Sequence, residues 1–210
     1  MTMIERLSFA SCYVYSPAGD SAICARSRLL RALLKDADAH FMIKYAARVR
    51  QQMQPASVLA GFFLSGDVLV PVPRSTPKVG GTWVAAELAR ALVQEGVGGA
   101  TWPGLHRISA VCKSATAAKG SRPSVERHYD SFRLEPLKLR PASVVIIDDV
   151  ITQGRTLLAA AARLREALPD AQIRAFALLR TRGLISGITN LLEPCRGEIR
   201  WRVGDARRIP

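Results

Sequence analysis

Two adjacent aspartates, Asp148 and Asp149, stand shortly before a five-residue run, Thr152–Thr156, that has a threonine at each end and a glycine in the middle. The carboxylates can accept hydrogen bonds from a vicinal diol or hold a hydrated magnesium ion, but they repel an anion. The run that follows has the opposite preference, because its threonines carry hydroxyl donors and Gly154 lets the backbone approach a ligand closely. A ligand that suits both ends has hydroxyls or a bound cation at one end and a phosphate at the other. A sugar phosphate has this chemistry.

The elements around these residues are predicted by their apolar patterns. Four successive β-branched residues, Val144–Ile147, show no alternation and predict a central parallel strand that is covered on both faces. A helix is expected over 157–168 and a further strand over 171–179, which completes a βαβ unit and indicates an α/β fold with a parallel sheet. In such folds ligands bind beyond the carboxyl ends of the strands, where the N-terminus of the next helix favours an anion.

The rest of the chain gives weaker signals. Apolar residues at helical spacing predict one helix over 27–53, and an Ala- and Leu-rich helix is expected over 83–94. Residues 67–73 are typical of a short buried strand that its prolines end. Residues 103–131 are polar, basic and without a clear period, which is typical of a functional or mobile loop. From Arg180 onward no structure is predicted. The arginines near the C-terminus are expected on the surface: Arg174, Arg180, Arg182, Arg200, Arg202, Arg207 and Arg208.

Composition excludes several classes of protein. With 210 residues, 49% of them hydrophobic, the chain can bury a core of ordinary size, so disorder of the bulk is excluded. No apolar run is long enough to span a bilayer, and the N-terminus does not read as a signal peptide, so we expect a cytoplasmic protein without a membrane partner. The four cysteines lack the spacing of a zinc site. The net charge of +13 suits nucleic acid, acidic lipid or a phosphate-rich small ligand without distinguishing them.

The segment Val144–Thr156 resembles the phosphoribosyl-pyrophosphate (PRPP) signature of the type I phosphoribosyltransferases. The wider layout, from the 27–53 helix through 70–74 to 177–180, is similar to the ComF-type branch, and the similarity covers roughly residues 13–183. The resemblance implies a type I phosphoribosyltransferase-like α/β fold, with a parallel sheet flanked by helices and a small N-terminal helical hood. The expected organisation is a helical segment over 1–66, the α/β core over 67–183 and a basic C-terminal segment over 184–210.

The same resemblance implies roles for individual residues. Asp148 and Asp149 would hold the ribose hydroxyls, directly or through Mg²⁺, and serve as both catalytic and metal-binding residues. The PRPP-binding residues would further include Val150, Thr152, Gln153, Gly154, Arg155 and Thr156. Pyrophosphate contacts are expected from Arg74, Ser75 and Lys113, and a catalytic role from Arg122, with Lys119 and Arg127 as further cations of a mobile loop that closes over the substrate.

Three departures from the family pattern bear on the function. Cys12 and Cys24 do not form the Cys-rich zinc module with which ComF-type proteins often begin. Gln153 and Arg155 replace the usual Thr and small residue of the phosphate turn, and Arg155 either adds a phosphate contact or crowds the site. Thr152 stands where salvage enzymes for 6-oxopurines carry an acidic residue, so those substrates are not expected here.

Two classes of function therefore stay open. The first is a phosphoribosyltransferase that moves ribose 5-phosphate from PRPP to an unidentified nitrogenous acceptor with Mg²⁺. The second is a non-catalytic PRPP- or nucleotide-sensing regulator, associated with nucleic acid through its basic surface. A receiver domain is rejected, because its paired acids would lie on the first strand. The sequence does not decide whether the protein is a homodimer. It also does not decide whether His128 has a functional role, whereas His40 and His106 are expected to be surface or packing residues.

Overall fold

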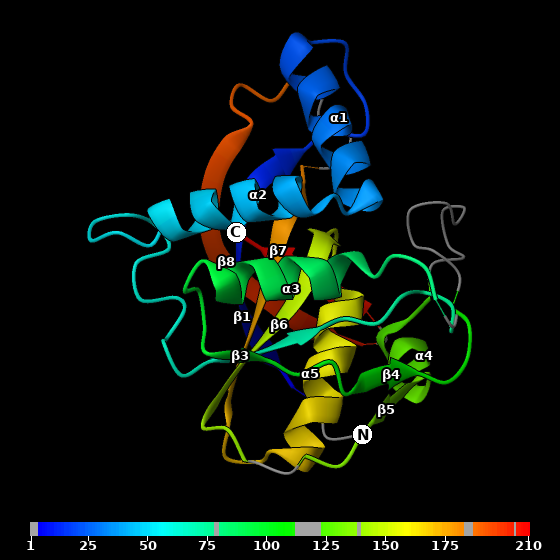
Figure 1. The fold of residues 1–210 in the computed structure, drawn as a ribbon. Helices are drawn as coiled ribbons and strands as arrows, with labels where there is room; N and C mark the ends of the chain where they lie inside the picture. Colours follow the sequence, from blue (N-terminus) through cyan, green and yellow to red (C-terminus); the bar gives the residue numbers. More distant parts are fainter. Residues whose placement is uncertain (1–3, 78–79, 112–122, 138–139, 183–186, 204) are drawn as a thin grey trace.

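The computed structural model describes residues 4–77, 80–111, 123–137, 140–182, 187–203 and 205–210. The strands are β1 Arg6–Tyr15, β2 Val68–Pro71, β3 Ala100–Thr101, β4 Leu105–Arg107, β5 Phe132–Leu134, β6 Ser143–Ile151, β7 Gln172–Thr181, β8 Leu192–Arg202 and β9 Asp205–Ile209. The helices are α1 Ala22–Asp36, α2 Ala39–Gln51, α3 Val84–Gln94, α4 Val125–Asp130 and α5 Arg155–Ala167 (Figure 1).

A central sheet has the strand order β3-β2-β6-β7-β1-β8-β9, and β4 and β5 form a separate antiparallel pair. The pairs β2–β3, β2–β6, β6–β7 and β1–β7 are parallel, whereas β1–β8 and β8–β9 are antiparallel. The α/β fold expected from the sequence is therefore confirmed, but the sheet is only mostly parallel because β8 and β9 are antiparallel; β6 lies in its interior between β2 and β7. A strand in this position is paired on both edges, which suits an unbroken apolar run.

Each face of the sheet is covered by its own apolar core. On one face, Val144 and Ile146 of β6 pack with the buried side of α5, including Leu157 and Leu158. On the other face, Val145 and Ile147 belong to a core to which α1, α2 and α3 contribute, with Leu88 among its α3 residues. Figure 1 shows α2 lying beside α3. The strand therefore has a fixed orientation, and its C-terminal residues are held at one edge of the sheet.

The N-terminal part differs from the prediction of a helical segment. Residues 6–15 form β1, a strand of the central sheet that is parallel to β7. The helix predicted over 27–53 is two helices, because Ala37 adopts a left-handed backbone with φ of 47° and ends α1. Asp38 then begins α2 by accepting a hydrogen bond from the Phe41 N–H at 3.1 Å. A capping aspartate of this kind satisfies a backbone donor that a continuous helix would have bonded internally.

The C-terminal part, for which no structure was predicted, forms the hairpin of β8 and β9. It extends the sheet beyond β1, and its Ile199 and Ala206 are buried in the same core as α5. The C-terminal segment is therefore part of the central sheet and not an appendage to it. Among the described residues, none of the helices has the length and apolar character needed to cross a membrane.

Candidate functional site at the carboxyl end of β6

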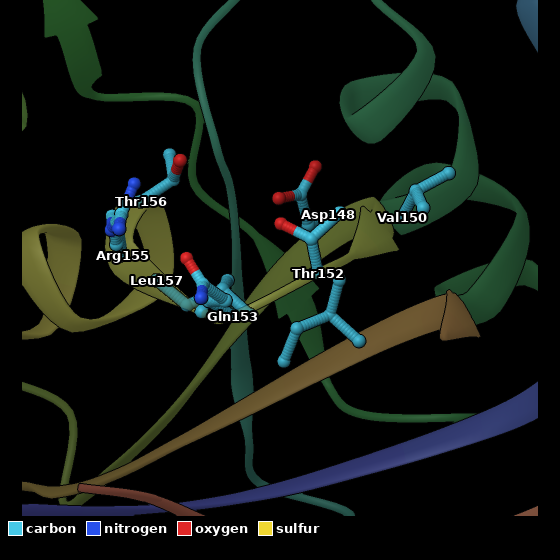
Figure 2. Close-up of a pocket in the computed structure, with 9 residues that line it drawn as sticks. Asp148, Val150, Thr152, Gln153, Arg155, Thr156 and Leu157 are labelled. Carbon is cyan, nitrogen blue, oxygen red and sulfur yellow. The ribbon is translucent and has the colours of Figure 1, made fainter. Parts of the chain in front are cut away.

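A small pocket of about 30 Å³ lies where β6 ends and α5 begins (Figure 2). Its lining residues come from one continuous stretch of chain: Asp148, Val150, Ile151, Thr152, Gln153, Gly154, Arg155, Thr156 and Leu157. All the predicted PRPP-binding residues except Asp149 line it. Figure 2 shows Asp148 and Thr152 near the end of β6, and Arg155 and Thr156 on the first turn of α5.

The N-terminus of α5 is left open by the local sequence. Gly154 is its N-cap residue, with φ of 89°, and no side chain among the described residues caps the first turn. By contrast, side chains cap α1, α2 and α4: Ser21, Asp38 and Ser124 accept hydrogen bonds from the first-turn N–H groups of those helices. The first N–H groups of a helix have no intrahelical acceptor and carry partial positive charge, so this end of α5 suits an anion.

The ionised carboxylate of Asp148, which lines the pocket, is electrostatically unfavourable in the free protein. Burial raises the pKa of Asp148 well above its usual value, and the charge of Asp149 raises this pKa further. The Asp149 N–H donates to Asp148 Oδ1 at 2.9 Å, and the charge of Arg107 also favours the ionised form, but both effects are smaller. A bound cation, or donors from ligand hydroxyls, would remove the repulsion between the two acids.

The side chain of Arg155 is held by an acidic residue of the C-terminal hairpin. Its guanidinium forms a two-point ion pair with Asp205 of β9, with Nε–Oδ1 and Nη2–Oδ2 distances of 2.5 and 2.9 Å. The pair raises the pKa of Arg155 and lowers that of Asp205. Arg155 is therefore held by the C-terminal hairpin at a position where it also lines the pocket.

A second contact joins the Thr152–Thr156 turn to the same hairpin. A Cβ atom on Gly154 would lie 2.8 Å from the side chain of Ile199 in β8, closer than real Cβ contacts. Any side chain at position 154 would therefore collide with β8 as well as strain the left-handed backbone. The turn needs glycine for both reasons.

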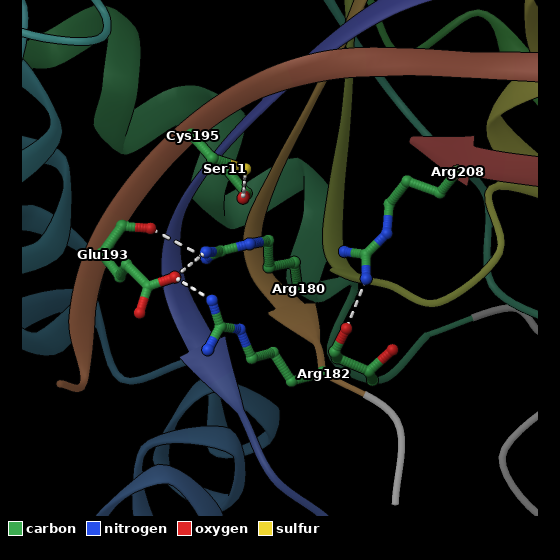
Figure 3. Close-up of polar contacts among 7 residues, drawn as sticks. Ser11, Arg180, Arg182, Glu193, Cys195 and Arg208 are labelled. Atoms are coloured by element: carbon green, nitrogen blue, oxygen red, sulfur yellow. Dashed lines mark hydrogen bonds and ion pairs between the residues drawn. The ribbon is translucent and has the colours of Figure 1, made fainter. Parts of the chain in front are cut away.

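The hairpin is in turn anchored to the end of β7 by arginines (Figure 3). Arg180 donates to the backbone carbonyl of Glu193 at 2.8 Å, and the carboxylate of Glu193 also pairs with Arg180 and with Arg182, the latter at 3.0 Å. Arg208 of β9 donates to the Thr181 carbonyl. The expectation that these arginines serve the surface is wrong for Arg174 and Arg180, whose exposed fractions are 6% and 5%.

Arg74 and Ser75, predicted to contact pyrophosphate, lie after β2 and do not line the pocket. Their backbone carbonyls are held from the other side of the loop: Arg107 Nε donates to the Arg74 carbonyl at 2.8 Å, and the Val111 N–H donates to that of Ser75 at 2.9 Å. The turn after β2 is thus fixed to the segment that leads into 112–122.

Arg107 is a buried cation that the sequence analysis missed. It lies at the end of β4 with 7% exposure, 4.4 Å from the centre of the Phe132 ring, and its Nη1 donates to Ser131 Oγ. Burial lowers its pKa to about 10, whereas the charge of Asp148 raises this pKa. One feature of the sequence could have indicated that Arg107 is buried: it stands two residues after Leu105. On a short strand this spacing puts both side chains on one face.

His128 of α4 is the other buried group beside the pocket. It is 4% exposed, and its Nε2 lies 3.5 Å from Thr156 Oγ1. Its Nδ1 has no hydrogen-bond partner within the part of the chain that the structure describes. Burial lowers its pKa to about 4, helped by the charges of Arg107 and Arg155, so the ring is neutral at physiological pH.

The remaining candidates are not brought into the pocket. Lys113, Lys119 and Arg122 fall on 112–122, outside the described residues, so their predicted roles stay predictions. Arg127 is described and exposed on α4. His106 pairs with Glu135 at 2.6 Å on the surface, and His40 is exposed, as expected.

No group of three or more metal-ligating side chains occurs in the ranges that the structure describes, and Cys12, Cys24 and Cys195 are free thiols. A magnesium site does not require such a group, because Mg²⁺ is commonly held by one or two carboxylates together with substrate oxygens and water. Asp148 and Asp149 fit this donor set. Compared with known proteins, the sequence matches no protein-family model and no curated protein.

Proposed function

We propose that the chain is a PRPP-binding phosphoribosyltransferase with a type I phosphoribosyltransferase-like fold, which uses Mg²⁺ and transfers ribose 5-phosphate to a nitrogenous acceptor. One observation carries the proposal: an uncapped helix N-terminus and a destabilised carboxylate line the same small pocket at the carboxyl end of an interior parallel strand. The first suits a phosphate, and the second suits ribose hydroxyls or a cation. PRPP presents both groups on one sugar.

The chain's own residues would divide the substrate between them. The Thr152–Thr156 turn and the first N–H groups of α5 would bind the 5′-phosphate. Asp148 and Asp149 would accept from the 2′ and 3′ hydroxyls or hold Mg²⁺, which supplies positive charge for the leaving pyrophosphate. The turn at Arg74 and Ser75, fixed by Arg107, would face the pyrophosphate end. These contacts would orient C1′ for displacement.

In the transfer, the bond from C1′ to the pyrophosphate oxygen breaks, a bond from C1′ to the acceptor nitrogen forms, and the proton that this nitrogen loses passes to the pyrophosphate or to water. The pyrophosphate leaves with the bonding electron pair, so positive charge develops on the ribose ring and negative charge on the leaving group. The Asp148 and Asp149 carboxylates would stabilise the ring charge, and Mg²⁺ together with the Arg74 side chain would stabilise the leaving group.

Release of pyrophosphate tests the reaction. The protein would be incubated with PRPP and Mg²⁺, and pyrophosphate would be measured with and without a panel of nitrogenous bases and amines. A transferase releases pyrophosphate slowly by hydrolysis and faster with its acceptor, and the Asp148→Asn/Asp149→Asn variant should release none. Binding of PRPP without release under any of these conditions would contradict the transferase and favour a sensor.

A second candidate, a PRPP sensor that associates with nucleic acid, is favoured by one feature of the sheet. Arg6 of β1, Arg200 of β8 and Arg207 of β9 are directly opposite one another in register. Arg200 is paired with Glu198 at 2.9 Å, but the three arginines outnumber this one acid, so the row suits a polyanion. Binding of single-stranded DNA that weakens with salt, and that is lost in Arg6→Gln/Arg207→Gln, would support this candidate. Arg26→Gln/Arg28→Gln on α1 is the control of equal charge.

A further inference from the structure

His128 combines three features that the proposed function does not use. It is almost completely buried, one ring nitrogen has no partner among the described residues, and the other faces a residue of the phosphate turn. Buried polar atoms are nearly always hydrogen-bonded, so a nitrogen without a partner needs a physical reason. The reason lies in which nitrogen carries the proton.

The surroundings of the ring favour one neutral tautomer. Arg107 and Arg155 both disfavour the doubly protonated ring, which leaves a single ring proton. A buried N–H without an acceptor costs more than a buried acceptor without a donor. Because Nδ1 has no partner among the described residues, the proton is placed on Nε2, where the Thr156 hydroxyl oxygen can accept it.

This tautomer decides what Thr156 presents to the pocket. A threonine hydroxyl has one proton to donate and can accept two hydrogen bonds. If Nε2–H donates to Oγ1, the hydroxyl proton of Thr156 is free to point into the pocket that this residue lines. If Nε2 were the acceptor, that proton would point at the ring and only oxygen lone pairs would face a phosphate.

Resting on the function proposed above, we propose that His128 is a positioning residue for phosphate recognition. As the Nε2–H tautomer it donates to Thr156 Oγ1 and thereby directs the Thr156 hydroxyl proton at the phosphate of a bound sugar phosphate. His128 does not touch the ligand. It converts a hydroxyl that could serve as donor or acceptor into a committed donor, which selects a phosphate dianion over a ligand group that donates hydrogen bonds.

Substitutions at position 128 distinguish the roles of the two ring nitrogens. In His128→Gln the amide nitrogen can occupy the place of Nε2 and donate to Thr156, whereas in His128→Asn the shorter side chain places its amide near Nδ1. His128→Leu fills the space without a donor. Affinity for ribose 5-phosphate would be measured by calorimetric titration of each full-length variant, with thermal unfolding as the check on folding.

We expect His128→Leu and His128→Asn to weaken ribose 5-phosphate binding about tenfold, the effect of one hydrogen bond to a charged ligand, and His128→Gln to restore most of it. In a Thr156→Val background, His128→Leu should cause no further loss, because the two residues act through one hydrogen bond. Additive losses, or equal losses in the Gln and Asn variants, would overturn the role of His128.

The tautomer of His128 can also be measured in the wild-type protein, so this test does not depend on a variant that folds. Long-range ¹H–¹⁵N correlation spectra distinguish the two neutral tautomers of a histidine ring, and His128 should show a protonated Nε2 and an unprotonated Nδ1 at neutral pH. The opposite tautomer overturns the inference. If the wild type binds ribose 5-phosphate and every His128 variant binds it equally well, the inference alone is overturned. If the wild type does not bind ribose 5-phosphate, the proposed function is overturned and the inference with it.

Discussion

Asp148 carries a carboxyl group whose ionisation is opposed by burial and by the neighbouring charge of Asp149. The free protein therefore bears an electrostatic cost at the position where the ligand is proposed to bind. A group with a raised folded-state pKa stabilises the fold below its unfolded pKa and loses that contribution as the pH rises through the folded pKa. Functional sites commonly hold such groups, because the ligand removes the cost.

Asp148→Asn removes the negative charge and keeps nearly the same side-chain shape. We expect the variant to unfold at a higher temperature than wild type at pH 8, with the difference disappearing below the usual carboxyl pKa of about 4, where wild-type Asp148 is protonated in both states. The same variant should lose Mg²⁺-dependent PRPP binding. Thermal unfolding against pH checks the first effect, and Asp170→Asn, at an exposed aspartate, is the control. A lower unfolding temperature for Asp148→Asn at pH 8 would contradict the account.

His128 has the opposite dependence on pH, because its folded-state pKa is lowered from 6.5 to about 4. The unfolded chain takes up this proton first as the pH falls, so its contribution to stability is complete above pH 6.5 and is lost between there and about pH 4. The loss amounts to about 3 kcal/mol for a shift of this size. In His128→Gln, the free energy of unfolding should therefore fall less between these pH values. Parallel pH profiles for the two proteins would show that His128 is not buried as a neutral ring.

At the scale of elements, the site depends on how the turn between β6 and α5 meets the C-terminal hairpin. Gly154 opens the helix N-terminus, and Ile199 of β8 packs against the position where a Cβ atom would stand. Arg155 is held by Asp205 of β9, so the first turn of α5 is fixed from the same side. The hairpin therefore supports the Thr152–Thr156 turn, although its own residues are not among those that line the pocket.

Gly154→Ala tests this support. The substitution strains a backbone with φ of 89° and pushes against Ile199, and we expect it to lower the free energy of unfolding by 1–3 kcal/mol, the usual order for such strain, and to weaken ribose 5-phosphate binding. Gly187→Ala is the matched control, because a Cβ atom there meets nothing within 4 Å. Chemical denaturation and calorimetry check the two effects. In Gly154→Ala/Ile199→Ala the collision is relieved but the backbone strain remains, so part of the ligand affinity should return.

The β6–α5–β7 unit was predictable from sequence, because an unbroken β-branched run, a glycine turn and a helical pattern are local signals. The break between α1 and α2 carried a signal too, since Asp38 is a strong N-cap residue, but the apolar period continued across it. The roles of Arg155 and Arg107 were not predictable. Each depends on a partner far along the chain, Asp205 for Arg155 and the Arg74 carbonyl for Arg107, and no local pattern encodes such a pair.

At the scale of the whole molecule, the two chain ends and the middle form one sheet. β1 lies between β7 and β8, so the N-terminal strand joins the parallel strands to the C-terminal hairpin. A buried ion pair ties other distant segments together: Arg174 of β7 pairs with Asp67 at 2.6 Å and donates to Ser143 Oγ at 2.6 Å. Such pairs are costly to break singly, because one buried charge is left without its partner.

Removal of residues 192–210 distinguishes a structural hairpin from a dispensable basic tail. The truncation exposes the edge of β1 and removes the buried Ile199 and Ala206. We expect the shortened chain to be unfolded or aggregated, since an exposed strand edge next to an opened core is an aggregation site. Replacing Arg202 and Arg207 by Gln, both exposed, removes basic charge but keeps the hairpin, and this variant should stay folded. Circular dichroism and size-exclusion chromatography decide between the outcomes.

Calorimetric titration of PRPP, with and without Mg²⁺, tests the central claim most directly. The account predicts that wild-type protein binds PRPP, that Mg²⁺ strengthens the binding, and that Asp148→Asn/Asp149→Asn abolishes the Mg²⁺ effect while Asp170→Asn retains it. It also predicts that Mg²⁺-dependent binding strengthens as the pH rises, because the raised pKa of Asp148 makes the metal compete with a proton. Absence of PRPP binding by wild type, or Mg²⁺-dependent binding that survives in the double variant, would contradict the account.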